Sequence, residues 1–260
     1  MGDTISLEIQ NNLALITMNR PEALNTISVE WVNDFHLVLN KIEASGQVRT
    51  AILTGAGRAF CAGADLNQAI FDTNSIEERR PSIEYGYLII KRIRRMPIPF
   101  IAAINGPAVG AGMTVALACD LRIASQGAYF RLDFIKMGVL PDMGCCFFLP
   151  HVVGTSKAMQ LAMLADQISA DEALSIGLVS KVVPDDEIMN NADNMAQRLA
   201  SLPPLALRYI KRAIYELPNQ AMEDALNTEA DYINYLIGTN DCREGRNSFL
   251  ENRPPRFSGT

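Results

Sequence analysis

An uncharged stretch from residue 97 to residue 119 constrains the fold of this chain more than any other feature of its sequence. Its apolar character would suit a membrane span. Prolines and glycines interrupt it, however, and Asn105 lies in its middle, as expected for a buried strand, a turn and the start of a helix. We therefore expect the interior of a soluble protein here and no membrane among the partners.

Short apolar runs alternate with helical segments along most of the chain. The predicted strands are residues 13–18, 50–54, 100–104, 121–124 and 179–183. After the first strand, Ser28 is a suitable N-cap, apolar residues from Trp31 to Ile42 repeat at helical spacing, and Gly46 ends the helix. Because the strands are apolar almost without interruption, both faces of their sheet must be covered, which is typical of α/β proteins.

From about residue 200 the pattern changes to helices alone. Pro203 and Pro204 begin this part, and apolar residues then recur at helical spacing up to Ile233. Two regions are therefore predicted, a core formed by residues 1–200 and a helical region formed by residues 201–260. The apolar faces of the helical region are expected to make contacts between copies of the chain.

Composition narrows the possible functions. The chain has 23 lysines and arginines against 29 aspartates and glutamates, a net charge of −6, which argues against nucleic acid as a partner. Its histidines stand in no metal-binding pattern, so no metal site is predicted. Cysteines without CxxC spacing, together with an N-terminus that lacks a signal-peptide pattern, predict a cytoplasmic protein. The one basic cluster, residues 91–95, is expected to be a solvated helix end.

Two glycine-rich segments carry the chemistry that the sequence suggests. The first, residues 59–66, has small residues that allow backbone to come close to a ligand. Gly55 and Gly57 begin a GxG pattern before it, but Phe60 replaces the third glycine of a dinucleotide-binding fingerprint. The second, residues 105–113, places unpaired backbone N–H groups at a helix start, where an anion can bind. A tight structural turn is the alternative for this second segment.

Through motifs that extend over nearly the whole chain, the sequence resembles the crotonase, or enoyl-CoA hydratase/isomerase, family. The matching segments are NRPEALN (19–25), AFCAGADL (59–66), IAAINGPAVGAG (101–112), ALACDLRIAS (116–125), GVLPDMG (138–144), SADEALSIGLVSKVVP (169–184) and REGRNSFLENRPPRF (243–257). The resemblance implies an α/β fold, a crotonase-like superhelix of ββα repeats whose residues 1–200 form the acyl-CoA-binding core. It further implies a C-terminal helical oligomerisation region that forms a homotrimer or homohexamer, an acyl-CoA thioester as substrate, and no cofactor beyond the coenzyme A that the substrate carries.

The resemblance also assigns site residues by position. The backbone N–H groups of Ala64 and Ala111 would hold the thioester carbonyl oxygen, where negative charge develops when the neighbouring carbon loses a proton. The residues that would line the coenzyme A site are Ala23, Leu24, Ala62, Asp65 and Leu66. Asp65 has an alternative role as the cap of a helix that begins near Leu66. The basic cluster has an alternative role near the CoA phosphates, and residues 70–87 are expected to shape the acyl pocket or to form a plain surface loop and helix.

The two glutamates of typical hydratases in this family are missing. Thr114 stands at the first position and Phe134 at the second, and the neighbouring Asp133 points in a different direction on any regular element. Asp142 remains, at a place where isomerase-type members carry an acidic proton shuttle. We expect burial among apolar neighbours to raise its pKa, as suits a carboxylic acid–base catalyst. The alternative is that Asp142 only caps the helix that follows Pro141.

One carboxylate is enough to move a proton between two carbons of an acyl chain. The leading prediction is therefore migration of a double bond from a 3-enoyl-CoA to a 2-enoyl-CoA, or a close ring-bearing variant, with Asp142 as the acid–base. The alternative reaction is hydration of a 2-enoyl-CoA, with Asp142 or Asp133 handling the water. The alternative class is a non-catalytic protein that binds CoA esters, and RNA binding is a more distant one that the acidic charge balance opposes.

Overall fold

A six-stranded sheet forms the centre of the computed structural model, which describes residues 4–67 and 76–260. In spatial order its strands are β1 (Ile5–Gln10), β2 (Leu13–Met18), β3 (Thr50–Gly55), β4 (Phe100–Ile104), β6 (Leu121–Ser125) and β9 (Lys181–Val183). β1 runs antiparallel to β2, and the other neighbours are parallel. The predicted strands are confirmed, the last of them as the shorter β9.

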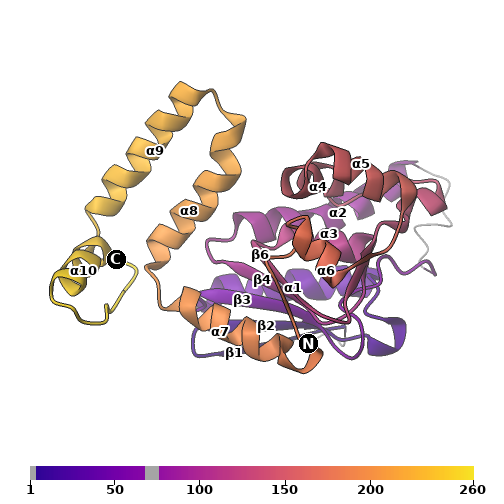
Figure 1. The fold of residues 1–260 in the computed structure, drawn as a ribbon, viewed down its shortest axis with the longest axis horizontal. Coiled ribbons are helices and arrows are strands. Elements are labelled where there is room, and N and C mark those ends of the chain that lie inside the picture. Colours follow the sequence, from indigo (N-terminus) through magenta and orange to yellow (C-terminus); the bar gives the residue numbers. More distant parts are fainter. Residues whose placement is uncertain (1–3, 68–75) are drawn as a thin grey trace.

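Helices connect and cover these strands (Figure 1). They are α1 (Val29–Ser45), α2 (Ile76–Arg95), α3 (Ala111–Ala118), α4 (Cys145–Val153), α5 (Thr155–Leu164), α6 (Ala170–Ser175), α7 (Ile188–Ala200), α8 (Pro204–Glu216), α9 (Met222–Ile237) and α10 (Asn240–Leu250). A small second sheet has the order β5 (Ala108–Val109), β7 (Tyr129–Arg131), β8 (Ile168–Ser169), and the short helical turns that border the site are η1 (Pro21–Ala23) and η3 (Asp133–Met137). This is the expected mixed α/β architecture.

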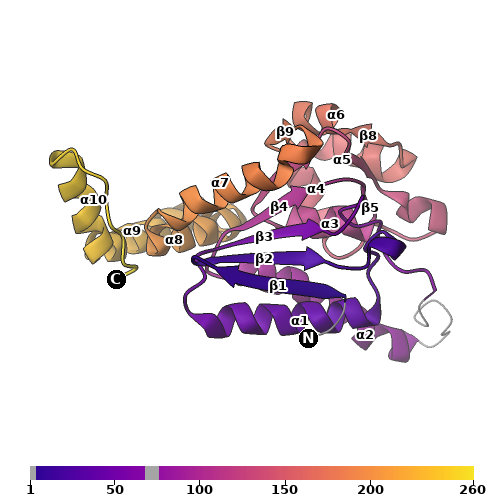
Figure 2. The same ribbon diagram turned by 90° about the horizontal axis from the view of Figure 1, so that it is seen from below.

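Both faces of the large sheet are covered, as its apolar strands require (Figure 2). Successive residues of a strand point to opposite faces. In β3, Leu53 belongs to the larger apolar core with α1, α2 and α3, whereas Ile52 belongs to a second core with α7. Every residue of α3 is buried, so this short helix lies inside the molecule and not on its surface.

The ends of α1 follow the predicted local rules. The Ser28 side chain accepts a hydrogen bond from the Trp31 amide at 3.2 Å, and Gly46 ends the helix with a φ of +59°. The start of α6 is capped in the same way, since the Ser169 side chain accepts a hydrogen bond from the Glu172 amide at 3.2 Å. Of the segment predicted to shape the acyl pocket, residues 70–75 lie outside the described residues, and the remainder forms the first half of α2.

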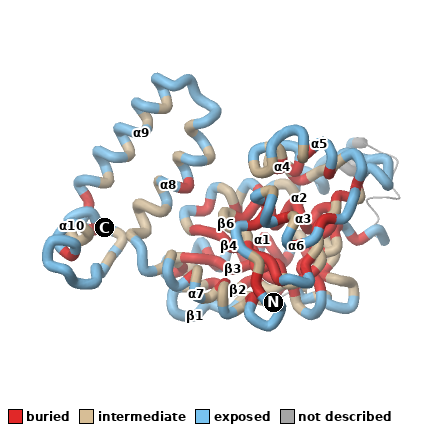
Figure 3. The backbone as a smooth tube through the Cα atoms, viewed as in Figure 1, coloured by how far each residue is buried: buried red, intermediate tan, exposed pale blue. Residues whose placement is uncertain are grey.

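The C-terminal helices α8, α9 and α10 extend away from the sheet (Figure 1), and most of their surface is exposed (Figure 3). The large apolar side chains exposed on them are Ile210, Ile214, Met222, Leu226, Ile233, Tyr235, Ile237, Phe249 and Leu250. The division into residues 1–200 and 201–260 stays a prediction. None of the helices in the described ranges combines the length and the hydropathy that crossing a membrane requires.

A buried histidine joins α1 to α2. Arg92 donates to His36 Nδ1 at 3.2 Å, so the proton of the neutral ring lies on Nε2, which faces the Tyr85 carbonyl oxygen at 3.0 Å. Arg92 also binds Asn40 and Glu43 of α1 at 2.8 and 2.9 Å. A protonated His36 would lose the bond from Arg92 and place a second cation beside it.

We therefore expect His36 to make folding sensitive to acid. Burial lowers the pKa of His36, and the charge of Arg92 lowers it further against the opposing effect of the Tyr85 carbonyl. Because the unfolded chain takes up this proton near pH 6.5, the contribution of His36 is present above that pH and is lost as the pH falls below it. Urea unfolding between pH 5 and pH 8 should show a smaller loss of stability in His36→Gln, whose neutral amide can keep both hydrogen bonds. An equal loss in both proteins would contradict this role.

Candidate active site

The segment from Cys61 to Asp65 lies between two other segments and hydrogen-bonds to both. On one side, the Cys61 amide donates to Pro107 at 3.1 Å and its carbonyl accepts from Val109 at 2.9 Å. On the other side, the carbonyl of Gly63 and the amide of Asp65 bond to Ile27 at 2.8 and 2.9 Å. The two glycine-rich segments predicted from the sequence are therefore adjacent, joined backbone to backbone.

The Ala64 amide is left free by this pairing. Ala64 forms a parallel bridge with Ile27, in which the amides and carbonyls of its neighbours make the bonds. Its own N–H therefore points away from Ile27, because successive peptide groups of an extended chain point in opposite directions. Gly63 has a φ of +102°, a conformation that favours glycine. Among the described residues, none accepts a hydrogen bond from the Ala64 amide.

The Ala111 amide lies beside it at the start of α3. A Cβ built on Gly63 would lie 3.8 Å from the Ala111 nitrogen and 3.0 Å from the Val109 carbonyl oxygen. Ala111 is the first residue of its helix, where amides have no partner within the helix. No acceptor in the described parts of the chain binds it either, whereas the Gly110 amide before it donates to Arg131 at 2.8 Å. The structure thus brings together two adjacent and unpaired amides, at a helix end that favours negative charge.

Gly112 explains how α3 can approach so closely. A Cβ at this position would overlap the Cys61 carbonyl oxygen and lie 2.7 Å from the Cys61 Cβ. The missing side chain lets the first turn of α3 lie directly on the segment that carries Ala64. The glycine pattern predicted close backbone approach, and here the approach is between two parts of the protein itself.

The residues predicted to line a coenzyme A site lie at one edge of this arrangement. The Ala62 amide donates to the Leu24 carbonyl at 3.0 Å, so Ala23 and Leu24 lie beside Ala62. Leu66 is 57% exposed on the neighbouring turn.

Asp65 has partners within the protein. It pairs with Arg20 at 3.0 Å and accepts a hydrogen bond from the Asn67 amide at 3.1 Å. The hydrogen bond from Arg20 is the main reason that the pKa of Asp65 is lowered. Residues 66 and 67 form a turn, and the residues through which a helix capped by Asp65 would continue lie outside the described ones, so that alternative stays a prediction. Arg20, which the sequence motif contained but did not distinguish, fixes the position of Asp65.

Asp142 lies in a tight turn that enters α4. Met143 and Gly144 after it both have positive φ angles, +51° and +93°. The helix has no side-chain cap, and its N-cap residue is Gly144, so the alternative role of Asp142 as a helix cap is wrong. Burial raises the pKa of Asp142 to about 6, although its own backbone amide acts in the opposite direction. The Oδ1 atom is buried without a hydrogen-bond partner in the described structure.

The neighbours of Asp142 connect it to the helix that carries Ala111. Thr114 lies one turn after Ala111 on α3 and hydrogen-bonds the thiol of Cys145, the first residue of α4. The Cys145 amide in turn donates to the Asp142 carbonyl at 2.9 Å. From α2, the Tyr87 phenol approaches the same turn: burial raises its pKa, the Met143 backbone lowers it, and the charge of Asp142 raises it.

The positions at which hydratases of the family carry glutamate offer no carboxylate here. Thr114 is buried, and the Phe134 ring would lie 3.9 Å from a Cβ on Gly110, beside the start of α3. Asp133 is held by Arg131 at 2.6 Å and by Lys136 at 2.8 Å. Burial acts to raise the pKa of Asp133, but these two cations outweigh it and the pKa is lowered. Of the three described carboxyl groups Asp65, Asp133 and Asp142, Asp142 is the one with which no cation forms an ion pair.

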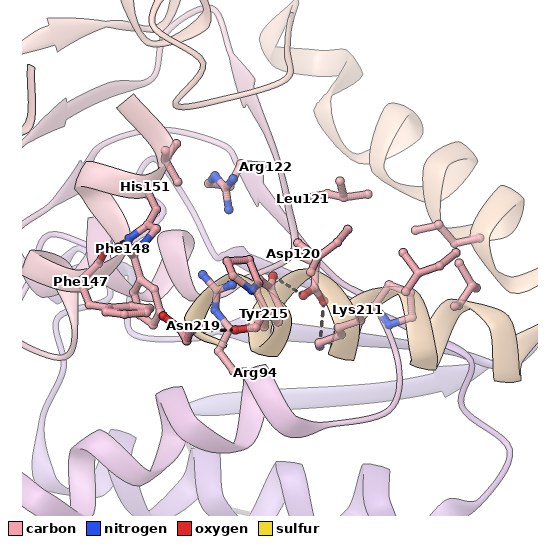
Figure 4. A pocket seen from close by; sticks show the side chains of 17 residues that line it. Arg94, Asp120, Leu121, Arg122, Phe147, Phe148, His151, Lys211, Tyr215 and Asn219 are labelled. Carbon is pink, nitrogen blue, oxygen red and sulfur yellow. Dashed lines mark hydrogen bonds and ion pairs between the residues drawn. The ribbon is translucent and has the colours of Figure 1, made fainter. Parts of the chain in front are cut away.

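A cavity of about 500 Å³ lies elsewhere, between α8 and the start of α4 (Figure 4). Its lining includes Phe148, Lys211 and Tyr215, but neither of the paired amides nor Asp142. Within the described ranges, no group of three or more histidine, cysteine, aspartate or glutamate side chains could hold a metal ion.

Comparison with known proteins agrees with this geometry. A sequence profile described as enoyl-CoA hydratase/isomerase matches residues 8–260. The chain belongs to the enoyl-CoA hydratase/isomerase family. An Escherichia coli relative named 1,2-epoxyphenylacetyl-CoA isomerase is 37% identical over the full length of both chains. A Clostridium acetobutylicum relative named short-chain-enoyl-CoA hydratase is 36% identical over 96% of each.

Solved structures of this family share the fold. An enoyl-CoA hydratase from Bacillus anthracis superposes with a TM-score of 0.93 at 33% identity, covering 99% of this chain and all of that one. The crotonase fold expected from the sequence is thereby confirmed. Because the relatives include both an isomerase and hydratases, the family is established more firmly than the reaction.

Proposed function

We propose that this enzyme of the enoyl-CoA hydratase/isomerase family moves a double bond in an acyl-CoA thioester, with Asp142 as its acid–base. One observation carries the proposal: a buried carboxyl with a pKa of about 6 is linked through Cys145 and Thr114 to the helix that presents one of two adjacent, unpaired amides, while the two hydratase glutamate positions hold Thr114 and Phe134. The pKa of such a carboxyl suits both removal and return of a proton near neutral pH.

In the proposed reaction Asp142 first removes a proton from the acyl chain and then returns it at another carbon, while the two amides hold the carbonyl oxygen. The Asp142 carboxylate removes a proton from the carbon between the thioester carbonyl and the double bond. The electron pair spreads into the carbonyl, whose oxygen becomes negative and is held by the amides of Ala64 and Ala111. Asp142 then returns the proton to the far carbon of the former double bond, and the double bond now lies next to the carbonyl. The reaction consumes no water, and the proposal requires no metal and no cofactor other than the CoA of the substrate.

The site supports coenzyme A binding along its Leu24 and Ala62 edge. Ala23 and Ala62 have small side chains, so the backbone of these two segments can approach the pantetheine arm closely. We include Ala23, Asp65 and Leu66 in this proposed surface. Asp65 would contribute indirectly, since Arg20 already occupies its carboxylate.

A panel of thioesters tests the reaction. We expect 3-enoyl-CoA substrates to gain the absorbance of a conjugated thioester at unchanged mass, and crotonyl-CoA to remain unchanged. Loss of that absorbance with the mass increase of one water would instead establish the hydratase activity for which several relatives are named. A protein that only binds CoA esters would show neither change and would exchange no acyl-chain protons in deuterated water.

The C-terminal helices support a homotrimer or homohexamer. Met222, Phe249 and Leu250 are 78%, 84% and 71% exposed, more than large apolar side chains of a monomer usually are. We propose that other copies of the chain cover these faces.

A further inference from the structure

Arg94, in the last turn of α2, lies between two aromatic rings. Its guanidinium carbon is 4.2 Å from the centre of the Phe148 ring and 4.0 Å from that of Tyr215 (Figure 4). Its Nη2 also donates to the Leu117 carbonyl at 2.7 Å. The structure therefore places this half-buried cation where α2, α3, α4 and α8 meet. The prediction that the basic cluster is a solvated helix end is therefore wrong for Arg94.

The contacts of Arg94 with Leu117 and with Phe148 lead to the two halves of the proposed site, the Ala111 amide and the Asp142 turn. Leu117 belongs to the last turn of α3, whose first residue is Ala111, so Arg94 binds the end of the helix that presents one of the paired amides. Phe148 belongs to the first turn of α4, directly after the Asp142 turn. Its ring would lie 2.9 Å from a Cβ on Gly144, and its amide donates to the Gly144 carbonyl at 2.9 Å.

The contact of Arg94 with Tyr215 leads to the C-terminal helices. The Tyr215 hydroxyl donates to Asp120 at 2.6 Å, and Lys211, one turn earlier on α8, pairs with the same carboxylate at 2.8 Å. The Lys211 ammonium also donates to the carbonyls of Ile93 and Ile98 at 2.9 Å each, on either side of the end of α2. Lys211 is only 9% exposed. This buried network holds Tyr215 in place, and the Tyr215 ring in turn covers the Arg94 guanidinium.

We propose that Arg94 is a positioning residue that sets the place of the Asp142 turn relative to the Ala111 amide and makes it depend on the docking of α8. Its effect on turnover rests on the proposed function, but its effect on the Asp142 turn does not. A planar guanidinium can stack on two rings and still donate a hydrogen bond in its own plane, which a lysine ammonium cannot do. The contact with Leu117 also places a cation at the C-terminal end of α3, where the helix dipole favours it.

Two arginine variants and two tyrosine variants test this proposal. In Arg94→Met, and to a smaller extent in Arg94→Lys, we expect kcat to fall on the order of 10- to 100-fold with KM nearly unchanged, as for other small misplacements of catalytic groups. Tyr215→Leu should act in the same direction, because it removes the ring. Tyr215→Phe should stay near wild type, because it keeps the ring and loses only the bond to Asp120. Arg212→Met is the matched control, since Arg212 also faces a ring, that of Tyr232, at 5.4 Å but touches neither α3 nor α4.

A second measurement is independent of turnover. In protein labelled with ¹³C at the aspartate carboxyl carbons, the Asp142 signal should titrate near pH 6 in the wild type and closer to 4 in Arg94→Met, because the loosened turn exposes the carboxyl. Unchanged titration and unchanged kcat in both Arg94→Met and Tyr215→Leu would overturn the proposal. So would a loss in Tyr215→Phe equal to that in Tyr215→Leu, which is expected if these residues only stabilise the fold. If the wild type acts on no thioester, the proposed function fails, and the titration still tests Arg94.

Discussion

Asp142→Asn is expected to lower turnover of a 3-enoyl-CoA by roughly 10²- to 10⁴-fold, the usual contribution of a positioned acid–base group. The amide has nearly the shape of the carboxylate but cannot take a proton from carbon. The paired amides of Ala64 and Ala111 remain, so binding of the thioester should be close to that of the wild type. Initial rates and an independent binding measurement, such as calorimetry with a saturated acyl-CoA, check the two halves of this expectation.

The companion variant is Asp133→Asn. Its carboxylate lies in the same part of the chain but is neutralised by Arg131 and Lys136, so we expect turnover to be largely retained. Near-normal turnover in Asp142→Asn would remove Asp142 from the mechanism. A large loss in Asp133→Asn alone would favour the alternative in which that residue handles water.

The pH dependence of both activity and stability follows from the position of Asp142. Its carboxyl must be ionised to start the reaction, so kcat/KM should fall about tenfold per pH unit below about pH 6 in the wild type.

Since the pKa is higher in the folded protein than in the unfolded chain, the stability associated with Asp142 is full below about pH 4 and is lost as the pH rises through about 6. Asp142→Asn should therefore be more stable than the wild type at pH 8, by on the order of 2–3 kcal/mol. Greater stability together with lost activity is the pattern expected of a catalytic residue.

Local signals in the sequence predicted the local parts of this structure. The apolar runs of β3 and β4, the Ser28 cap and the Gly46 stop of α1 all depend on residues within a few positions of one another, and all were found as predicted. The two glycine-rich segments could be paired only through the family resemblance. No pattern in the sequence says that the backbone from Cys61 to Asp65 lies between Ile27 and Val109.

The residues that were misjudged are those whose partners lie far away along the chain. Arg94 belongs to a run of cations that is typical of an exposed helix end, and only the later placement of Phe148 and Tyr215 makes it an interior contact. For Lys211 there was no prediction, and its buried pairing with Asp120 likewise depends on a residue far away along the chain. Helical periodicity identifies one face of a helix, but it does not show which other element will cover the remaining faces.

Replacement of Ala111 by proline is expected to remove one of the two backbone N–H groups proposed to hold the thioester oxygen. Side-chain substitutions leave a backbone amide in place, but proline has no N–H and also fills the space in front of it. The first position of a helix is where proline is best tolerated. Gly110 before it has no Cβ to clash with the ring, and its ψ of −124° is extended and not helical. We therefore expect Ala111→Pro to fold and to lose roughly 10²- to 10³-fold in kcat, the effect of removing one donor from an oxyanion hole.

Ala111→Gly provides the control, because it removes the same methyl group and keeps the amide. It should retain most of the activity, with only the modest loss of stability that glycine causes in a helix. Thermal unfolding and circular dichroism of both variants would separate misfolding from loss of the donor. Comparable activity in Ala111→Pro and Ala111→Gly would mean that the amide does not stabilise charge in the transition state. In that case Asp142 could still move protons, but the enolate oxygen would have to be held by other groups, and the adjacency of the Ala64 and Ala111 amides would be only a consequence of how α3 packs on the neighbouring backbone.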